Sequence, residues 1–229
     1  MRQRFAAIMP RSVVLKRTPR CVECQLPPRW CICGGFRPVD CALKVDVLIH
    51  YMESLRPSST GTLINRVMPS SGRHVFRRER PLERAAMVQP GKALWILHPA
   101  GEPLPLDEPV AGVQVLLLDG TWVQANGMMR AVEGWGRRVS LPMAGASRYW
   151  LRTQADEGRF STAEALLFLL AALGLRREHD ELRRQFELHV YASLCARGKK
   201  RDAADYLVDS PLRDAFPDLL AELARRRPR

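Results

Sequence analysis

Short apolar runs alternate with segments of helical periodicity through most of this chain. Short apolar runs bounded by turn residues are typical of buried strands, and helical segments between them are typical of βαβ units. The alternation therefore predicts an α/β domain with a mainly parallel sheet flanked by helices. The expected strands cover residues 45–51, 93–97, 113–118 and 138–141.

Helix signals are clearest in the C-terminal half of the chain. Ser161 and Glu164 have the spacing of a capping box, and Gly174 fits a C-terminal stop. Amphipathic patterns predict two further helices. The expected helices cover residues 161–174, 180–198 and 212–227, the last interrupted by Pro217, and the basic segment 198–201 is expected to be an exposed loop.

Polar residues follow three of the expected strands. Loops at the carboxyl ends of parallel strands form the crevice in which such sheets bind ligands. Any ligand-binding side chains of this domain are therefore expected at these strand ends. The candidates there are His50, Glu53, His98 and Asp119.

Asp119 directly follows the apolar run V-L-L-L. A carboxylate leaves water only if something compensates it, either the N–H groups of the helix expected near Thr121 or a cationic ligand. In the local interpretation Asp119 caps that helix, Trp122 packs on the sheet, and Met128 and Met129 belong to the core. The residues alone leave both interpretations open.

Four cysteines near the N-terminus have a spacing that predicts a metal site. The segment C-V-E-C-Q-L-P-P-R-W-C-I-C places Cys21, Cys24, Cys31 and Cys33 in a C-x2-C-x6-C-x-C array. Four thiolates close a tetrahedral shell around zinc with no open position, so the metal would be structural. The alternatives are free thiols or a redox pair. Cys41, outside the array, is expected in the core.

Composition bounds the class of protein and its partners. With 229 residues, 46% of them hydrophobic, the chain can bury a core, which excludes a disordered protein. The net charge of +12 favours a polyanionic partner, although an arginine-rich soluble protein would have the same charge. The N-terminus lacks a signal peptide pattern and no apolar stretch is long enough to span a bilayer, so a cytoplasmic location without membrane contact is expected.

The expected organisation is a basic arm with the cysteine knuckle at 1–40, followed by one α/β domain at 41–229. The sequence contains no Walker loop, no G-x-G-x-x-G after a strand, no H-E-x-x-H and no G-x-S-x-G. Phosphate-cradling, zinc-protease and serine-hydrolase interpretations therefore lack support.

Five ordered motifs together resemble the DTW-domain proteins, the tRNA-uridine aminocarboxypropyltransferases. They are the cysteine array, L-I-H-Y-M-E-S-L-R-P-S-S-T-G-T-L-I, I-L-H-P, D-G-T-W-V-Q-A-N-G-M and S-R-Y-W-L-R-T-Q-A-D-E-G-R-F-S-T-A-E-A-L. The chain departs from the family pattern at Tyr51, Ser59, His98 and the pair Asn126-Gly127. None of these departures removes Asp119 or a cysteine of the array.

The resemblance implies transfer of the 3-amino-3-carboxypropyl group from S-adenosylmethionine to N3 of a tRNA uridine, with release of methylthioadenosine. It also implies a SPOUT-like fold with the cofactor in a knotted loop region near the C-terminal part of the sheet; whether this chain is knotted stays open. Asp119 is the candidate general base, or else a group that orients the ligand. The residues expected at the cofactor are Leu97, His98, Pro99, Gly120, Thr121, Trp122, Leu141, Pro142, Tyr149, Ser161, Thr162 and Glu164.

Basic residues are expected to bind the tRNA, with a structural zinc ion in the knuckle. Arg152 could instead contact the cofactor carboxylate, and the capping box alone would explain Ser161 and Glu164. Two alternatives to the transferase are a SPOUT-type RNA methyltransferase and a non-catalytic zinc-knuckle RNA-binding protein. The oligomeric state is open, with a monomer slightly favoured. The expected RNA-binding residues are Arg29, Arg66, Arg73, Arg77, Arg78 and Arg152.

Overall fold

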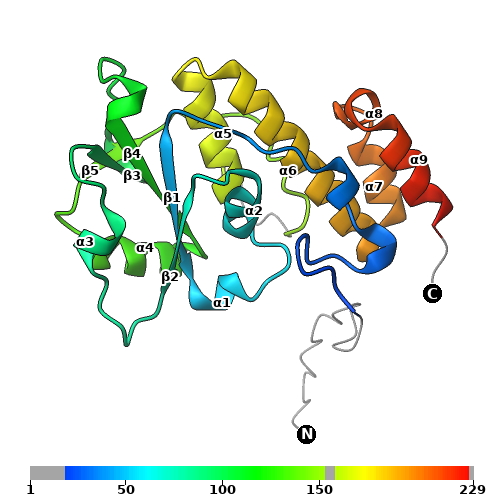
Figure 1. Cartoon of the computed structure of the whole chain (residues 1–229), viewed down its shortest axis with the longest axis horizontal. Coiled ribbons are helices and arrows are strands. Elements are labelled where there is room, and N and C mark those ends of the chain that lie inside the picture. Colours follow the sequence, from blue (N-terminus) through cyan, green and yellow to red (C-terminus); the bar gives the residue numbers. More distant parts are fainter. Residues whose placement is uncertain (1–18, 153–157, 227–229) are drawn as a thin grey trace, which may run out of the picture.

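A five-stranded parallel sheet forms the centre of the domain in the computed structural model, which describes residues 19–152 and 158–226 (Figure 1). All four strand pairings are parallel, and the strand order is β2-β1-β4-β3-β5. The predicted parallel α/β sheet is therefore confirmed. The strands are β1 (Lys44–His50), β2 (Gly72–Phe76), β3 (Ala93–Pro103), β4 (Val113–Asp119) and β5 (Arg137–Ser140).

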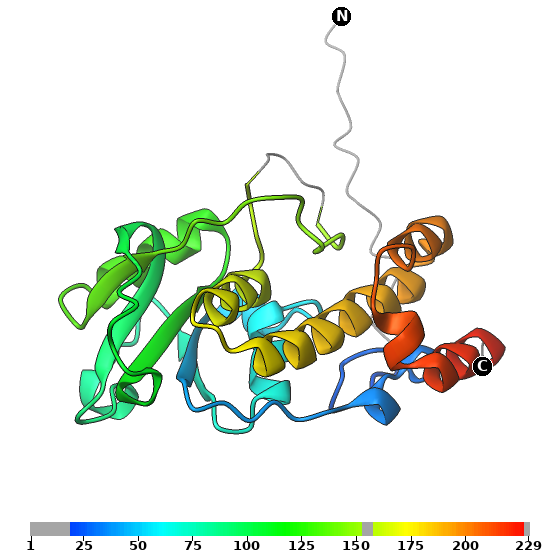
Figure 2. The same ribbon diagram turned by 90° about the horizontal axis from the view of Figure 1, so that it is seen from above.

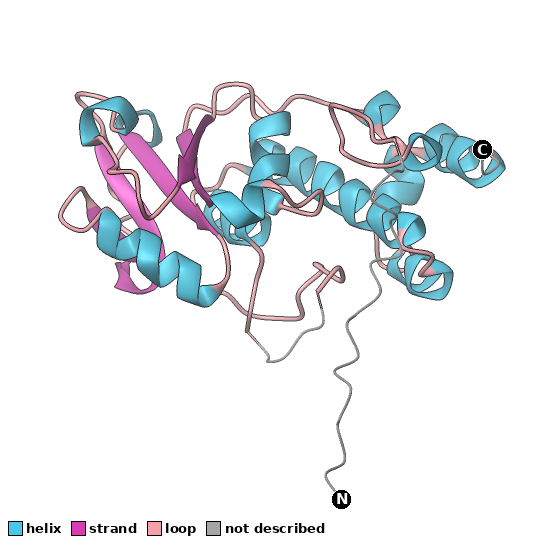
Figure 3. Ribbon diagram, turned by 90° about the horizontal axis from the view of Figure 1, so that it is seen from below, coloured by secondary structure: helices cyan, strands magenta, loops and turns pink. Residues whose placement is uncertain are grey.

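Helices cover both faces of the sheet (Figures 2 and 3). Alternate residues of a strand point to opposite faces, so Val45, Val47 and Ile49 of β1 enter one apolar cluster while Leu48 enters another. The first cluster includes residues of α2 (Thr60–Val67), α5 (Thr162–Ala172) and α6 (Arg176–Ala196). The second includes residues of α3 (Arg84–Met87) and α4 (Trp122–Ala131). Burial on both faces explains the nearly continuous apolar runs of the inner strands.

Two strands depart clearly from the expectation, while β1, β4 and β5 agree with their expected bounds to within one residue at each end. β2 was not predicted, because its sequence G-R-H-V-F is basic and only alternately half-buried at the edge of the sheet. β3 extends to Pro103, beyond the expected end at residue 97, through a register shift between Leu97 and Glu102 against β5. Leu97 and Glu102 both pair with Val139, so the four residues between them form an irregular part of β3. This part contains His98 and Pro99.

The capping box of α5 is confirmed. The Ser161 hydroxyl accepts from the Glu164 N–H, and the Glu164 side chain accepts from the Ser161 N–H. α5 ends at Ala172 and is followed by Gly174 at φ +70°, a conformation that favours glycine.

The expectations for the chain after residue 174 needed three corrections. α6 begins at Arg176, before the expected start at 180. The segment 198–201 is not wholly a loop, because α7 (Lys200–Tyr206) begins inside it. The helix expected at 212–227 is two helices, α8 (Leu212–Ala215) and α9 (Pro217–Arg225), with Pro217 in the first turn of α9, where its missing N–H costs least.

The cysteine-bearing segment packs against the C-terminal helices, far along the sequence (Figure 1). It contains two short 3-10 helices, η1 (Pro28–Trp30) and η2 (Cys33–Gly35). Ile32 of this segment shares an apolar cluster with Leu188 of α6 and Leu223 of α9, and all three are fully buried. A Cβ on Gly35 would lie 2.7 Å from the Leu219 side chain, so only glycine allows this approach. The domain boundary expected near residue 40 stays a prediction.

Two short elements complete the description, α1 (Tyr51–Ser54) after β1 and η3 (Val110–Gly112) before β4. In the described ranges, no helix combines the length and the apolar character that crossing a bilayer requires.

A buried histidine in α6 makes folding stability depend on pH. His189 is 3% exposed, and neither ring nitrogen has a hydrogen-bond partner among the described residues. Burial, with smaller contributions from the cationic Arg66 and Arg197, lowers the pKa of His189 from 6.5 to about 3. The unfolded chain therefore takes up a proton below pH 6.5 that the folded chain does not accept until about pH 3.

Above pH 6.5 His189 is neutral in both states, and we expect it to cause no loss of stability there. Between pH 7 and pH 5 we expect protonation of His189 in the unfolded chain to lower the free energy of unfolding by about 2 kcal/mol. Urea unfolding of the wild type and of His189→Gln at both pH values measures this. The variant should lose less stability than the wild type over that interval. An equal loss in the two proteins would contradict the prediction.

Candidate functional site

A cavity of about 520 Å³ lies at the carboxyl ends of β3, β4 and β5. Its size is in the range of small-molecule sites. Ten of the twelve residues predicted at the cofactor line it, although they come from five separate places in the chain. They are Leu97, His98, Pro99, Gly120, Thr121, Trp122, Leu141, Tyr149, Ser161 and Thr162.

Two of the predicted residues are not part of this lining. Pro142 is exposed beside it. Glu164 is 5% exposed, and its carboxylate accepts hydrogen bonds from the Ser161 N–H, the Arg148 N–H and the Ser147 hydroxyl. Glu164 therefore holds the loop before α5 onto the helix, as the capping-box interpretation expected.

The turn after β4 has a conformation that its sequence explains. Thr121 is the N-cap of α4, where its hydroxyl accepts from the Gln124 N–H at 3.4 Å and its N–H donates to the Gln124 side chain at 2.8 Å. This reciprocal pair starts the helix directly after the strand. The cap interpretation was therefore right about the helix and wrong about the residue, because Thr121 and not Asp119 is the cap.

Trp122 is 45% exposed and lines the cavity, so its expected packing on the sheet is wrong. The core positions of α4 are Met128 and Met129, as expected. An exposed indole beside a cavity offers a flat face on which a nucleobase can stack. His98 lies in the irregular part of β3, with Nε2 3.4 Å from the Asn126 side-chain oxygen.

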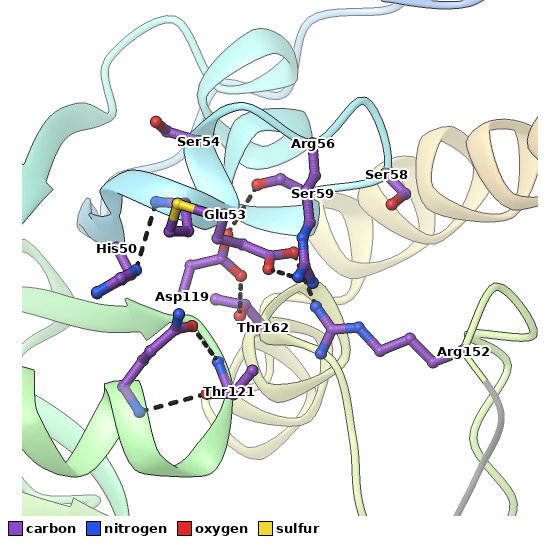
Figure 4. A network of polar contacts seen from close by, with 12 residues as sticks. His50, Glu53, Ser54, Arg56, Ser58, Ser59, Asp119, Thr121, Arg152 and Thr162 are labelled. Carbon is purple, nitrogen blue, oxygen red and sulfur yellow. Dashed lines mark hydrogen bonds and ion pairs between the residues drawn. The ribbon is translucent and has the colours of Figure 1, made fainter. Parts of the chain in front are cut away.

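Asp119 is not among the residues that line the cavity and is 1% exposed, and Figure 4 shows its hydrogen bonds. Its Oδ2 accepts from the Ser59 hydroxyl at 2.7 Å, and its Oδ1 accepts from the Thr162 hydroxyl at 2.6 Å. Ser59 is also the N-cap of α2, and Thr162 is the first residue of α5. The buried carboxylate thus joins β4 to the starts of two helices. It reaches the cavity through Thr162, which lines it.

Gly61 makes the close packing around Asp119 possible. A Cβ at this position would lie 2.7 Å from Asp119 Oδ2 and 2.8 Å from its Cβ. We expect Gly61→Ala to displace the carboxylate and to lower the free energy of unfolding by about 1–3 kcal/mol. Chemical denaturation measures the loss, with Gly127→Ala in α4 as the control because its Cβ would meet no atom within 4 Å. Equal stability of Gly61→Ala and the wild type would show that the packing is looser than described.

A second polar group borders the cavity on the side of α1 (Figure 4). Glu53, 1% exposed, forms ion pairs with Arg152 at 2.8 Å and with Arg56 at 3.0 Å. Arg152 lies over the ring of Tyr149, with 5.3 Å from its guanidinium carbon to the ring centroid. The Tyr149 hydroxyl donates to the Ser58 carbonyl oxygen at 2.6 Å, and burial raises the pKa of that hydroxyl.

The predicted RNA-binding arginines do not form one surface. Arg73, Arg77 and Arg78 are exposed on β2 or directly after it. The Arg77 guanidinium carbon lies 4.9 Å from the centroid of the Tyr51 ring. Arg77 therefore adjoins the carboxyl end of β1, where Tyr51 begins α1, whereas Arg73 pairs with Val47 further back along that strand.

Arg29 and Arg66 are in different surroundings. Arg29 is half-buried in the cysteine segment, with its guanidinium carbon 4.8 Å from the centroid of the Trp30 ring. In Arg66, Nε and Nη2 are buried, and burial lowers the pKa of the guanidinium. These Arg66 nitrogens are inaccessible to a phosphate in this conformation, whereas Arg152 is at the cavity.

The four cysteines of the array converge, and their sulfur atoms all lie within 4.8 Å of one another. The Sγ atoms of Cys21 and Cys33 are 3.6 Å apart, and those of Cys24 and Cys31 are 3.7 Å apart. Four thiolates at about 2.3 Å from a zinc ion would be about 3.8 Å from one another. All six cysteines are in the described ranges, and none of them forms a disulfide there. The donor set therefore fits a tetrahedral metal ion.

Backbone hydrogen bonds and burial shift the pKa values of these thiols in opposite directions. A hydrogen bond from the Cys24 backbone is the main cause that lowers the pKa of Cys21 to about 7, so this thiol is close to ionising at neutral pH. Burial raises the pKa of Cys24 and of Cys33. A bound cation would supply the charge that keeps the buried thiols ionised.

Sequence reasoning missed two residues that organise the site. Ser59 was noted only as a departure from a family pattern, and Gly61 was not singled out. A signal was present in S-S-T-G-T-L-I-N, where a hydroxyl residue precedes an apolar segment of helical period. The partner of the Ser59 hydroxyl, 60 residues away in the sequence, could not be read from it.

Comparison with known proteins identifies both a family and relatives. The family model described as "DTW domain" matches residues 18–194. A tRNA-uridine aminocarboxypropyltransferase 2 from Mus musculus is 28% identical over 173 residues, which are 69% of this chain and 57% of that protein. The protein of the same name from Drosophila melanogaster is 27% identical over 174 residues, 71% of this chain and 69% of that protein. No solved structure matches.

Coverage of the relatives is incomplete. The corresponding protein of Macaca fascicularis is 27% identical over 173 residues, and, as with the mouse protein, the match spans 57% of its length. Residues 18–194, which the family model matches, contain the strands, the cavity and the cysteine array of this chain.

Proposed function

The chain belongs to the DTW domain family, and on that premise we propose that it transfers the 3-amino-3-carboxypropyl group of S-adenosylmethionine to N3 of a tRNA uridine. The observation that carries the proposal is the cavity, which gathers nine residues predicted from three separate family motifs, together with Leu141. The names of the mouse and fly relatives agree with this activity. Reduced cysteines and a tRNA substrate agree with a cytoplasmic enzyme.

We infer that S-adenosylmethionine binds in this cavity, whose volume of about 520 Å³ is in the range of small-molecule sites. Apolar side chains at Leu97, Leu141 and Ala165 offer surface to the adenine ring. Strand-end backbone at Gly120, which lines the cavity, would offer hydrogen bonds to an uncharged nucleoside without a phosphate loop. The indole of Trp122, at the open side, is placed to stack on the incoming uracil.

The reaction forms a bond from uracil N3 to the γ-carbon of the methionine chain while the bond from that carbon to sulfur breaks. The electron pair of the broken bond stays on sulfur, which leaves as neutral methylthioadenosine. The N3 proton must be removed, and we assign this task to Asp119 acting through Thr162. The Thr162 hydroxyl accepts the N3 proton while it passes its own proton to Asp119 Oδ1, 2.6 Å away.

The exposed cations near β2 and the cysteine segment are the proposed tRNA contacts. Arg73, Arg77 and Arg78 supply positive charge to phosphates, and Arg77 with Tyr51 supplies a stacked cation and ring. The cysteine array would hold one structural zinc ion, which fixes the segment that carries Arg29.

Transfer of isotope label from S-adenosylmethionine to unmodified tRNA tests the proposal. We expect label in the carboxyl carbon to enter the tRNA and label in the methyl group to remain in solution. Incorporation of the methyl label would identify a methyltransferase instead. Tight tRNA binding without incorporation of either label would identify a binding protein.

A further inference from the structure

Glu53 is a buried carboxylate that the reaction as described does not use. It lies in α1, directly after β1, and is 1% exposed. A buried charge is tolerated when it is paired, and Glu53 is paired twice, with Arg152 at 2.8 Å and Arg56 at 3.0 Å. The two partners come from segments nearly 100 positions apart in the sequence. Glu53 therefore fixes one guanidinium relative to the other.

Arg152 is the member of this group that borders the cavity. Its side chain is 42% exposed, and its Nη2 donates to Glu53 Oε1. The Tyr149 ring supports one face of the guanidinium, and the Tyr149 hydroxyl is itself held by Ser58. Burial opposes the charge of Arg152, but Tyr149, Glu53 and Asp119 together raise its pKa. The result is a cation with a restricted orientation at the rim of the cavity.

Among the directly paired side chains two guanidiniums face one carboxylate, so one positive charge is in excess of direct pairing, with Asp119 acting on Arg152 from further away. A single carboxylate is the ligand group that this excess charge and the planar fork of an arginine match best. In S-adenosylmethionine the only carboxylate is on the chain to be transferred. Methylthioadenosine, which lacks that chain, has no carboxylate.

We propose that Glu53 is a positioning residue that holds Arg152 in place to bind the carboxylate of the aminocarboxypropyl chain. The inference rests on the proposed function. Anchoring the far end of the chain directs its γ-carbon, in preference to the methyl group, toward the nucleophile, because attack requires alignment with the breaking bond.

Calorimetric titration with S-adenosylmethionine and with methylthioadenosine tests this on the full chain. Glu53→Gln should weaken S-adenosylmethionine binding about tenfold, equivalent to about 1.4 kcal/mol, and leave methylthioadenosine binding within about twofold. Arg152→Gln, at a half-exposed side chain, should show the same selective loss if Glu53→Gln does not fold. Glu102→Gln is the matched control, since it breaks an exposed carboxylate–arginine pair, with Arg137, outside the cavity lining.

The outcomes separate the two proposals. Equal weakening of both ligands in Glu53→Gln would mean a general structural role and would overturn the inference alone. Unchanged binding of both ligands would also overturn the inference. So would a loss confined to tRNA binding, because it would assign Arg152 to the RNA. A wild-type protein that binds neither ligand would overturn the proposed function and this inference together.

Discussion

Asp119→Asn is expected to slow aminocarboxypropyl transfer by about a hundredfold or more, while the Kd for S-adenosylmethionine changes by less than about tenfold. The carboxylate accepts from both Ser59 and Thr162, and the single amide oxygen of asparagine can replace only one of its two acceptor atoms. The Thr162 hydroxyl then loses its acceptor or its orientation. Because Asp119 is buried and does not line the cavity, ligand binding should depend on it less than the chemical step does. Single-turnover transfer rates and equilibrium titration measure the two effects separately.

Thr162→Val is the matched test of the proposed proton route. It keeps the shape of the side chain and removes the hydroxyl between Asp119 and the cavity. We expect it to reduce the transfer rate nearly as much as Asp119→Asn does. The double variant should be little slower than either single variant, because all three variants interrupt the same proton route. Full activity of Asp119→Asn would remove Asp119 from the mechanism. A large loss in Asp119→Asn with full activity in Thr162→Val would mean that Asp119 acts without the hydroxyl.

Cys24→Ser is expected to abolish metal binding and to lower the free energy of unfolding by about 4 kcal/mol or more, since loss of a structural metal is among the most destabilising changes. Cys24 is 2% exposed, and its sulfur lies among the other three of the array. The segment it anchors shares an apolar cluster with α6, α8 and α9, so the loss should reach the C-terminal helices. Metal analysis, with about one zinc per chain in the wild type, and chemical denaturation measure both effects.

Cys41→Ser is the control for the cysteine array. Cys41 is half-buried against the main apolar cluster and lies outside the four converging sulfurs. We expect the full metal content and a loss of about 1 kcal/mol. A wild-type protein that is purified without metal and is equally stable would contradict the assignment of the array.

The sequence predicted the parallel sheet well because buried strands depend on local patterns, whereas most residues that line the cavity were expected from the family resemblance. Apolar runs such as 113–118 identify buried strands, and parallel strands place their carboxyl ends at one edge, so residues after them converge. β2 was missed because an edge strand buries only alternate residues and here contains polar ones. Pro217 correctly indicated an interruption, yet the pattern could not show that a new helix begins there.

The environment of Asp119 could not be predicted, because it depends on contacts between distant segments. The same sequence would suit a carboxylate facing the ligand, and only the packing of Gly61 and the hydroxyl of Ser59 turn it inward. The burial of Arg66 could not be predicted for the same reason. An arginine close to other arginines in the sequence predicts an exposed basic surface, but Nε and Nη2 of Arg66 are buried. Sequence patterns indicate which segments approach the site, whereas side-chain packing decides which atoms reach it.

A crystal structure of the protein with S-adenosylmethionine tests the central claim most directly, namely that the cavity at the carboxyl ends of β3, β4 and β5 holds the donor. We predict adenosine density between Leu97, Gly120 and Leu141, with the methionine chain directed toward Thr162. Donor bound at another site, with this cavity empty at saturating concentration, would contradict the account.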